Sequence, residues 1–366
     1  MHGRETGPSL ALVSSLVPPS SLALVAARVD DRLRELLDLE QARWTAFDAD
    51  LAEPLGEIGR LVLAGGKRLR PAFAHWGFVG AGGDPGDPVV VDAGAAFELM
   101  HAFALFHDDV MDDAATRRGS PTTHAVFAAE HARNGWAGEP RRFGDGVAIL
   151  VGDLAFVYAD QLLNGVSPEA WAIWNELRIE LNVGQVLDIL GSARRDRRPD
   201  KASRICRYKS GKYTIERPLH LGAMLAAPER AGELLPALSA YGLPLGDAFQ
   251  LRDDVIGAFG DEGVAGKPVG GDLREGKPTP MLARAVELSS EAQGEVLDQV
   301  GRPGMTDLQV AAAQQVIVDT GALADLEAVI AELTDRALAA IATAPITEEA
   351  RVELIALAHY VSVRQL

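Results

Sequence analysis

Apolar residues recur at helical spacing along almost the whole chain. After Ser21, a plausible N-cap, steps of three and four residues separate Leu22, Val25, Val29, Leu33, Leu36 and Leu37. The same period predicts helices over residues 93–106, 147–163, 171–190, 234–259 and 308–342, and a terminal helix capped by Thr347. No run alternates with the two-residue period of a strand. We therefore expect an all-α protein.

Breaks rich in glycine, proline and polar residues separate these helices, at residues 80–88, 134–146, 196–200 and 261–280. None resembles a linker between domains, so we expect one large bundle of roughly ten or more helices over residues 21–366. Residues 1–20 are expected to form a flexible tail. Residues 6–27 carry no formal charge, as in a secretory signal, but Pro18-Pro19 divides the apolar region and favours the tail. Residues 134–146 are expected to be a mobile surface loop.

Composition narrows the classes of function. The chain has 366 residues, 48% of them hydrophobic, which is enough for a sizeable core, and its net charge of -17 argues against a nucleic-acid partner. The one cysteine, Cys206, cannot form an internal disulfide; we expect it to be a packing residue in a reducing, cytoplasmic compartment. We expect no transmembrane segment, because no apolar run reaches about 18 residues.

A first acidic run follows the apolar residues 97–106. A helix places Asp108 and Asp112 on one face, with Asp109 and Asp113 beside them. The four carboxylates repel one another unless hard cations neutralise them, and magnesium suits such oxygen ligands while sharing its shell with substrate phosphates. A solvated helix end is the alternative, although acids there oppose the helix dipole. Residues 117–118 are both arginines, which can pair with the acids or hold phosphate oxygens.

A second acidic run, Asp253-Asp254, lies near the end of another apolar helix. Two carboxylate-bearing helices that face each other across a bundle can hold magnesium ions and a diphosphate between them. Lys67 and Arg70 lie in a glycine-flanked basic turn that could hold a phosphate group. Further basic positions are Lys209, Lys212, Lys267 and Lys277. Two acid pairs with several separate basic sites suggest two anionic substrates.

Taken in order, several motifs resemble those of the trans-prenyltransferases, also called polyprenyl diphosphate synthases. They are GGKRLRP (65–71), HDDVMDDAATRRGSPTTH (107–124), GD (152–153), GQVLD (184–188), YKSGKYT (208–214), FQLRDDVIGAFGD (249–261) and GK (266–267). The resemblance implies a helical bundle of the isoprenoid synthase type with a central active-site cavity, usually in a dimer. It also implies a magnesium-dependent head-to-tail condensation of isopentenyl diphosphate with an allylic diphosphate of five, ten or fifteen carbons, giving an all-trans product.

The resemblance also implies roles for individual residues. Asp108 and Asp112 would ligate two magnesium ions and Asp253 a third. Other residues on the metal side would be Asp109, Asp254, Gln185 and Asp188. The allylic diphosphate would be held by Arg117, Lys209 and Lys267, with Ser210 replacing the usual threonine and Lys277 nearby. Isopentenyl diphosphate would contact Gly66, Lys67, Arg70, His101 and Arg118. Gln250 and Tyr213 would lie beside the allylic cation.

One position departs from the family pattern. The second acidic motif usually ends in a third aspartate, but this chain has Gly257 there. Asp261 follows four residues later at a position that matches another family residue, so it does not count as a replacement. We expect the change to remove one contact to metal-bound water and to leave the third magnesium on Asp253.

The reaction also needs an apolar wall that keeps water from the allylic cation, and Phe103, Phe106 and Phe249 can contribute to it. No side chain stands out as the general base, so the released diphosphate is the expected proton acceptor. Phe103 lies five residues before Asp108, about 7.5 Å deeper along a helix. It can therefore be a floor for the growing chain, with small Ala104 beside it and Met100 one turn deeper.

An aromatic residue and a small residue at these positions resemble geranylgeranyl diphosphate synthases. Ordinary core packing of Phe103 is the alternative, and a farnesyl or longer product stays open. Two other functions also stay open. A terpene cyclase shares the fold but needs no second anion site, against which the Lys67 turn argues. A non-catalytic partner subunit is expected to lose one aspartate pair, and this chain keeps both.

Overall fold

The computed structural model describes residues 18–117, 119–194, 198–260 and 270–362. Its longer helices are α1 (Ser20–Phe47), α2 (Ala52–Val62), α3 (Leu69–Gly80), α4 (Pro88–Met111), α5 (Thr123–Asn134), α6 (Pro140–Leu162), α7 (Pro168–Arg194), α10 (Ala231–Phe259), α15 (Asp307–Asp319), α16 (Ala322–Ala342) and α17 (Glu348–Ser362). Shorter helices are α8 (Pro199–Cys206), α9 (Arg217–Ala226), α12 (Gly271–Glu275), α13 (Pro280–Leu288) and α14 (Glu291–Leu297). The prediction of an all-α fold is confirmed.

Three further helical turns and one small ribbon complete the described chain. Residues Ala49–Leu51 and Pro228–Arg230 form single 3₁₀ turns, and Arg207–Glu216 forms a π-helix that continues into α9. Strands β1 (Thr116–Arg117) and β2 (Ser120–Pro121) pair antiparallel. The expectation that no strand occurs is wrong for this ribbon, which is too short to show any period in the sequence.

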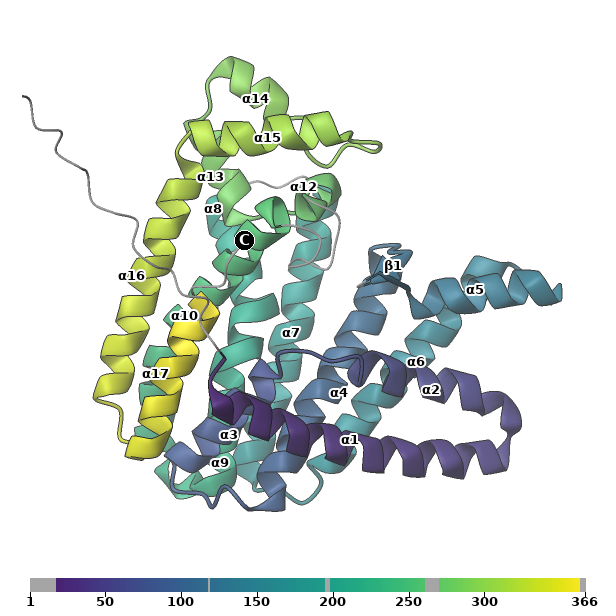
Figure 1. Cartoon of the computed structure of the whole chain (residues 1–366), viewed down its shortest axis with the longest axis vertical. Helices are drawn as coiled ribbons and strands as arrows, with labels where there is room; N and C mark the ends of the chain where they lie inside the picture. Colours follow the sequence, from purple (N-terminus) through teal and green to yellow (C-terminus); the bar gives the residue numbers. More distant parts are fainter. Residues whose placement is uncertain (1–17, 118, 195–197, 261–269, 363–366) are drawn as a thin grey trace, which may run out of the picture.

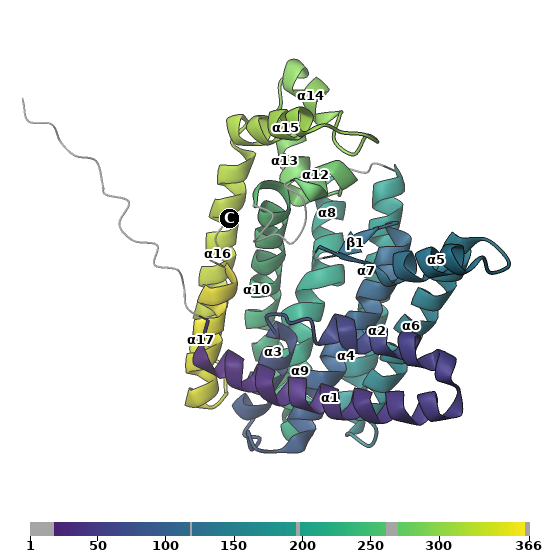
Figure 2. The ribbon, with the colours of Figure 1, turned by 45° about the vertical axis from the view of Figure 1, so that its right-hand side comes forward.

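The bundle is arranged around α4, α6, α7 and α10, which run side by side (Figures 1 and 2). Helix α1 crosses near one end of these helices, and α16 and α17 lie along one side (Figures 1 and 2). Helices α14 and α15 cover the opposite end from α1 (Figure 1). The long helices thus form the body of the molecule, and both aspartate runs lie on members of this central group.

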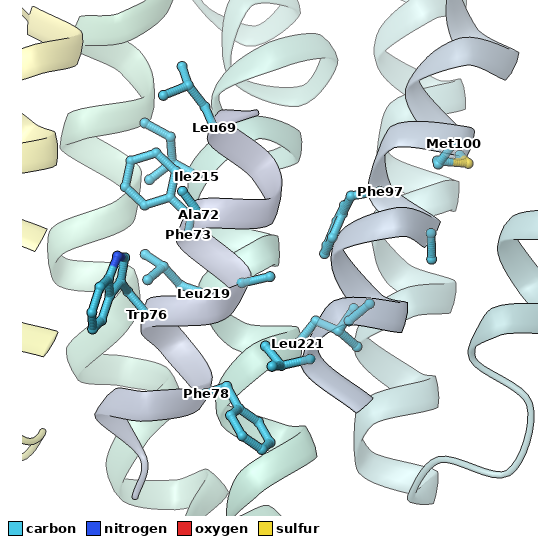
Figure 3. Packing of buried hydrophobic residues seen from close by; sticks show 14 of the residues in the cluster. Leu69, Ala72, Phe73, Trp76, Phe78, Phe97, Met100, Ile215, Leu219 and Leu221 are labelled. Atoms are coloured by element: carbon cyan, nitrogen blue, oxygen red, sulfur yellow. The ribbon is translucent and has the colours of Figure 1, made fainter. Parts of the chain in front are cut away.

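Two apolar clusters form the core. In the larger one, Phe73 of α3 lies beside Ile215 and Leu219, and Phe97 projects from neighbouring α4 (Figure 3). The smaller cluster lies between α13, α15, α16 and the last turns of α10. Helix α10 belongs to both, through Leu245 to the larger and through Val255 to the smaller. This shared helix joins the two clusters.

Helices α3 and α9 pack with their backbones in contact. A Cβ atom on Gly222 would lie 2.0 Å from the carbonyl oxygen of Ala74, and one on Gly77 would lie 2.3 Å from that of Leu219. Only glycine permits this approach, because the obstructing atoms belong to rigid helix backbones.

Several predicted boundaries need correction. Helix α1 begins at Ser20, and the hydroxyl of Ser21 donates to Glu353 instead of capping the helix. The predicted loop at 134–146 is much shorter, because α6 already begins at Pro140 behind a cap made by Glu139. The predicted helix over 308–342 is two helices, because Gly321 adopts φ 81° between α15 and α16. Thr347 is confirmed as the cap of α17, since its hydroxyl accepts from the backbone of Ala350.

Helix α4 is long and apolar enough, by length and composition alone, to cross a membrane. Asp92 and Glu98 interrupt its apolar residues, so the helix meets this criterion on average hydropathy and contains no continuous apolar run of about 18 residues. Within its most apolar window, 61% is buried inside the protein, as in the core helix of a globular bundle. Cys206 is buried, as expected of a packing residue.

We predict that Gly222→Ala destabilises the protein, because the new methyl group must push α3 and α9 apart. Overpacking of this kind costs about 1–3 kcal/mol, which urea denaturation measures as a lower free energy of unfolding. Gly232→Ala is the matched control, since a Cβ there meets no atom within 4 Å. An unchanged stability in Gly222→Ala would show that the helix pair yields without cost.

Candidate active site between two aspartate-bearing helices

The first aspartate run lies at the C-terminal end of α4. Asp108 and Asp109 are in the last turn, and Asp112 is the C-cap residue. Asp109 is buried, and the Nε of Arg117 donates to its carboxylate at 2.8 Å. The guanidinium of Arg117 also lies 3.6 Å from Asp108. The β1–β2 ribbon therefore places Arg117 beside the aspartates, as the sequence spacing suggested.

Asp108 is held from a second side by α7 and the π-helix. Gln185 donates to its Oδ1 at 3.0 Å, and the Lys209 ammonium lies 3.3 Å from the same oxygen. Lys209 also donates to Asp188 at 2.6 Å. Burial opposes ionisation of Asp108, but Lys209, Lys277 and Arg117 outweigh it and lower its pKa. Asp108 is therefore ionised in a polar network built by three separate elements.

At Asp112 the attraction of Lys277 and Lys209 does not outweigh the opposing effects. Although the residue stays exposed, partial desolvation and then the charge of Asp108 raise the pKa of its carboxyl to about 6. The pair of carboxylates thus carries an electrostatic cost that a cation between them would remove.

The second aspartate run lies near the C-terminal end of α10. Asp254 is buried, and the Gln250 amide donates to it at 2.9 Å. Burial, and to a lesser extent Asp272 and Asp253, raise the pKa of Asp254 well above its ordinary range. Gln250 therefore braces an aspartate here, in addition to the contact with the allylic cation that the resemblance implies.

Lys277 connects the two acidic groups. Its ammonium lies 3.3 Å from Asp272 and 3.0 Å from Glu275. It also attracts the carboxylates of Asp108 and Asp112 on one side and of Asp254 on the other. Since one ammonium group acts on both sets, the ends of α4 and α10 both lie near Lys277. The sequence placed these runs about 145 residues apart, and folding brings them together.

The donor set fits magnesium. All the candidate ligands are carboxylate oxygens, which hard cations prefer, and they come from facing helices. Among the described residues, no three carboxylate, imidazole or thiolate side chains are grouped closely enough to hold a metal ion by themselves. This is the arrangement expected where water and substrate phosphates complete the shell.

The π-helix Arg207–Glu216 sets the position of Lys209, Ser210 and Tyr213. It approaches α7 so closely that a Cβ on Gly184 would lie 2.5 Å from the backbone nitrogen of Lys209. This contact explains why Gln185, one residue on, shares Asp108 with Lys209. A π-helix is rare and is often found at functional sites. Sequence analysis did not anticipate it, because its apolar spacing differs little from that of an α-helix.

A buried ion cluster anchors this π-helix. Glu180 of α7 accepts from Lys212 and from two nitrogens of Arg217, each of the latter at 2.7 Å. Burial disfavours its charge, but Arg217 and Lys212 outweigh burial and lower the pKa of Glu180. The charges of this cluster therefore compensate one another away from the aspartates. Sequence analysis missed it, since no short-range pattern links Glu180 to Arg217.

The residues of the basic turn divide into two kinds. Arg68 is buried in a left-handed conformation, φ 48°, and its guanidinium pairs with Glu98 and with Asp30 at 2.7 Å. It is therefore structural. Lys67 is exposed, as is Gly66, and Arg70 lies with its guanidinium 4.3 Å from the ring centre of Tyr213. The turn thus places Lys67 at the surface and Arg70 against the π-helix.

His101 and Arg70 meet at the same ring. The His101 imidazole centre lies 6.3 Å from that of Tyr213, and Arg70 donates to Thr214 at 3.2 Å. Residues from α3, α4 and the π-helix therefore gather around Tyr213. The network on Asp108 is built from other residues, Gln185, Lys209 and Arg117. The predicted residues Arg118 and Lys267 lie outside the described residues.

The predicted floor residues lie along α4. Phe103 stacks against Phe156 of α6, with ring centres 4.9 Å apart, and against His107 at 4.6 Å. Met100 is fully buried, whereas Ala104 is partly buried. Phe106 is almost completely buried in the core, and Phe249 is 7% exposed.

Comparison with known proteins gives consistent results. Residues 53–317 match the model of the family described as Polyprenyl synthetase. Geranylgeranyl diphosphate synthase of Mycobacterium tuberculosis is 35% identical over 284 residues, 74% of this chain and 75% of that protein. (2E,6E)-farnesyl diphosphate synthase of Mycobacterium bovis is 30% identical over 371 residues, 99% of this chain and 94% of that protein.

Among solved structures, a geranylgeranyl pyrophosphate synthase from Corynebacterium glutamicum, complexed with isoprenyl diphosphate and magnesium, superposes with a TM-score of 0.88. It is 37% identical in sequence, and the match covers 94% of this chain and 99% of that one. The similarity therefore extends over nearly the whole bundle.

We predict that Glu180→Ala strongly destabilises the protein, because it leaves the charges of Lys212 and Arg217 uncompensated. Breaking a buried pair of this kind costs about 3–5 kcal/mol, measurable as a lower free energy of unfolding in urea. Asp325→Ala is the control, since Asp325 pairs with Arg284 at 2.9 Å on the exposed surface, where such a pair is worth about 1 kcal/mol or less. Equal effects in the two variants would contradict the anchoring role.

Proposed function

The chain belongs to the polyprenyl synthetase family, and from that premise we propose that it makes geranylgeranyl diphosphate. It is a prenyltransferase that adds isopentenyl diphosphate head to tail to an allylic diphosphate. The all-α fold of the isoprenoid synthases, expected from the motifs, is confirmed by the solved relative. The observation that carries the proposal is the meeting of both aspartate runs around Lys277.

The enzyme uses magnesium, as its family and the magnesium-bound relative indicate. We propose three ions, two held by Asp108 and Asp112 and one by Asp253, with Asp254 supporting through water. Bound magnesium would neutralise the diphosphate so that it can leave its allylic carbon. Arg117, Lys209 and Lys277 lie among these aspartates and would hold the same diphosphate oxygens, with Lys267 and Ser210 assisting.

The second anion site is proposed around the basic turn. Lys67 is exposed at the turn, and Arg70 and His101 lie against Tyr213. With Gly66 and Arg118, these groups would orient isopentenyl diphosphate so that its double bond attacks the allylic cation. Holding the two reacting groups in this orientation lowers the activation free energy, because the entropy of bringing them together is already lost on binding. No side chain stands out as a general base, so the released diphosphate is the proposed proton acceptor.

The proposed product length depends on α4. Phe103 lies five residues before Asp108 and is pinned by rings on two sides, so it is a rigid obstacle to a growing tail. Ala104 leaves room beside it. A farnesyl product is the second candidate, because the farnesyl diphosphate synthase of M. bovis aligns with 99% of this chain. A terpene cyclase or a non-catalytic subunit has less support, since the Lys67 turn and both aspartate pairs are present.

We also propose a homodimer in the cytoplasm with no transmembrane segment. Several exposed apolar residues lie on α6 and α7: Ile149, Leu150, Val157, Ile179, Val183, Val186 and Ile189. Those on α7 follow a helical period, so they share one face that a second copy can cover. The buried, unpaired thiol of Cys206 suits a reducing compartment.

We predict that purified protein with magnesium converts labelled isopentenyl diphosphate and a five-, ten- or fifteen-carbon allylic diphosphate into a longer prenyl diphosphate. Asp108→Ala and Asp253→Ala should lower the rate by about 100-fold or more, as for other lost electrostatic contacts to a developing charge. Asp335→Ala, an exposed aspartate on α16, is the control. Chromatography of the extracted product gives its chain length.

The same assay separates the rival functions. Lys67→Ala should raise the KM for isopentenyl diphosphate while leaving the affinity for the allylic substrate nearly unchanged. A cyclised hydrocarbon formed without isopentenyl diphosphate would identify a cyclase. Absence of any product, with normal folding, would favour a non-catalytic subunit.

We predict that Phe103→Ala lengthens the product beyond that of the parent protein, because the side chain that blocks the tail is removed. The measurement is the product distribution at equal conversion. Phe47→Ala is the control, since Phe47 is 79% exposed at the end of α1. If Phe103→Ala folds, turns over and keeps the parent product, Phe103 is a packing residue only.

A further inference from the structure

The turn that ends α4 is made by Asp113, which adopts the left-handed conformation with φ 54°. Its backbone nitrogen donates to the carbonyl of Val110 at 3.4 Å, and that of Ala114 donates to the carbonyl of Asp109 at 3.0 Å. These two hydrogen bonds form the Schellman motif, in which the left-handed position is usually glycine. Aspartate adopts this conformation less readily than glycine because of its Cβ. A contact of the Asp113 side chain is therefore expected to favour it.

The carboxylate of Asp113 pairs with Arg141, in the first turn of α6. The Nη2 of Arg141 lies 3.1 Å from Asp113 Oδ1, and its Nε lies 3.8 Å from Asp145 Oδ2, one turn farther along α6. Arg141 is thus held from its own helix and directed at the end of α4. Both side chains of the Arg141–Asp113 pair are more than half exposed, 58% and 64%. A pair of that strength can bias the conformation of one turn but cannot hold two helices together.

The start of α6 is fixed by a small aromatic cluster in the hairpin between α5 and α6. The imidazole of His131 is buried, with its centre 5.9 Å from the ring of Trp136 and 5.1 Å from that of Phe143. The rings of Trp136 and Phe143 also contact each other, with centres 5.4 Å apart. Glu139 caps the helix that follows. The hairpin therefore presents Arg141 to the end of α4 from a fixed position.

The turn at Asp113 sets the positions of two groups proposed to act on the allylic diphosphate. Asp112 directly precedes it as the C-cap of α4, and Arg117 follows four residues later in β1. After the turn, the hydroxyl of Thr122 donates to the carbonyl of Ala114 at 2.7 Å. The segment between α4 and β1 is therefore tied at the turn and again at Thr122. A change of conformation at Asp113 would move both Asp112 and Arg117.

We propose that Arg141 is a positioning residue for the allylic diphosphate. By holding Asp113 in the left-handed conformation, it places the last turn of α4 with Asp112 and the ribbon with Arg117. The proposal rests on the proposed function, which makes Asp112 a magnesium ligand and Arg117 a diphosphate ligand. It gives the α5–α6 hairpin a part in the reaction that acts only through the turn. The isopentenyl diphosphate site around Lys67 is built by other elements and should not depend on Arg141.

Two other roles for Arg141 predict different results. A purely electrostatic role would attract anionic substrates through the net charge of the hairpin. Arg142, the next residue, is also an exposed arginine, so its loss would then have the same effect. A purely structural role within the hairpin would lower the free energy of unfolding and leave the KM values of both substrates unchanged.

The first experiment measures steady-state kinetics with labelled isopentenyl diphosphate and a fifteen-carbon allylic diphosphate. Arg141→Ala should raise the KM for the allylic diphosphate by about 3- to 5-fold, as expected for the loss of one exposed ion pair. The KM for isopentenyl diphosphate should stay the same. Arg141→Lys keeps a charge near Asp113 and should fall between the parent protein and Arg141→Ala. Arg142→Ala is the matched control and should equal the parent protein.

Two double variants separate the conformation of the turn from its charge. Arg141→Ala combined with Asp113→Gly lacks the ion pair but favours the left-handed turn, so it should recover much of the affinity lost in Arg141→Ala. Arg141→Ala combined with Asp113→Ala removes the same two charges and keeps a Cβ at the turn, so it should stay defective. Magnesium affinity, from the rise in melting temperature with inorganic diphosphate present, should follow the same order without requiring turnover.

The outcomes separate this inference from the proposed function. If the parent protein forms no product and magnesium with diphosphate does not stabilise it, the proposed function fails and this inference with it. If the parent protein is active and Arg141→Ala keeps the parent KM for the allylic diphosphate, the inference alone is overturned. Equal effects of Arg141→Ala and Arg142→Ala would overturn it as well, and so would equal KM values in the two double variants.

Discussion

Mutual repulsion among carboxylates is the constraint on which the rest of the structure depends. Acidic side chains from α4, α10 and α12 converge, and Coulomb repulsion at such distances costs several kcal/mol when the groups are shielded from water. Three cations offset this repulsion by forming ion pairs with the acids: Arg117, Lys209 and Lys277. These cations are also the groups proposed to hold a diphosphate. Magnesium would pair with the carboxylates and the diphosphate with these cations, so each can enter this network as the partner of one set.

Holding like charges together requires a scaffold that does not relax. Repulsion would separate the ends of α4 and α10 if these helices were held only near the aspartates. Their packing along most of their length resists this, since α4 contributes Phe97 and Met100 to the larger cluster and α10 joins both clusters. The Glu180 cluster adds a second restraint, because it fixes the π-helix that carries Lys209. The apolar core and the buried ion cluster thus allow the active-site charges to stay close.

The sequence predicted the helices that carry a continuous apolar period, and it predicted which aspartates and basic residues gather. The prediction from the sequence failed where a single residue sets a helix boundary or where a long-range contact sets the role of a side chain. Gly321 divides a region whose apolar pattern runs on, and Glu139 starts α6 in a stretch that reads as loop. The role of Arg68 was hidden, since its neighbours Lys67 and Arg70 carry the same charge and only burial against Glu98 distinguishes it. Long-range pairs such as Glu180 with Arg217 leave no local signal.

Gly257 shows that the order of residues in a motif does not by itself give the positions of the carboxylates around it. Read along the chain, the second acidic motif lacks its third aspartate, which predicts the loss of one contact to metal-bound water. In three dimensions a carboxylate occupies the same volume, contributed by a residue fifteen positions later, and glycine is what admits it. A metal responds to the position of negative charge and not to the helix that supplies it. The absence of a side chain at Gly257 lets α12 approach α10 and lets Asp272 reach Lys277.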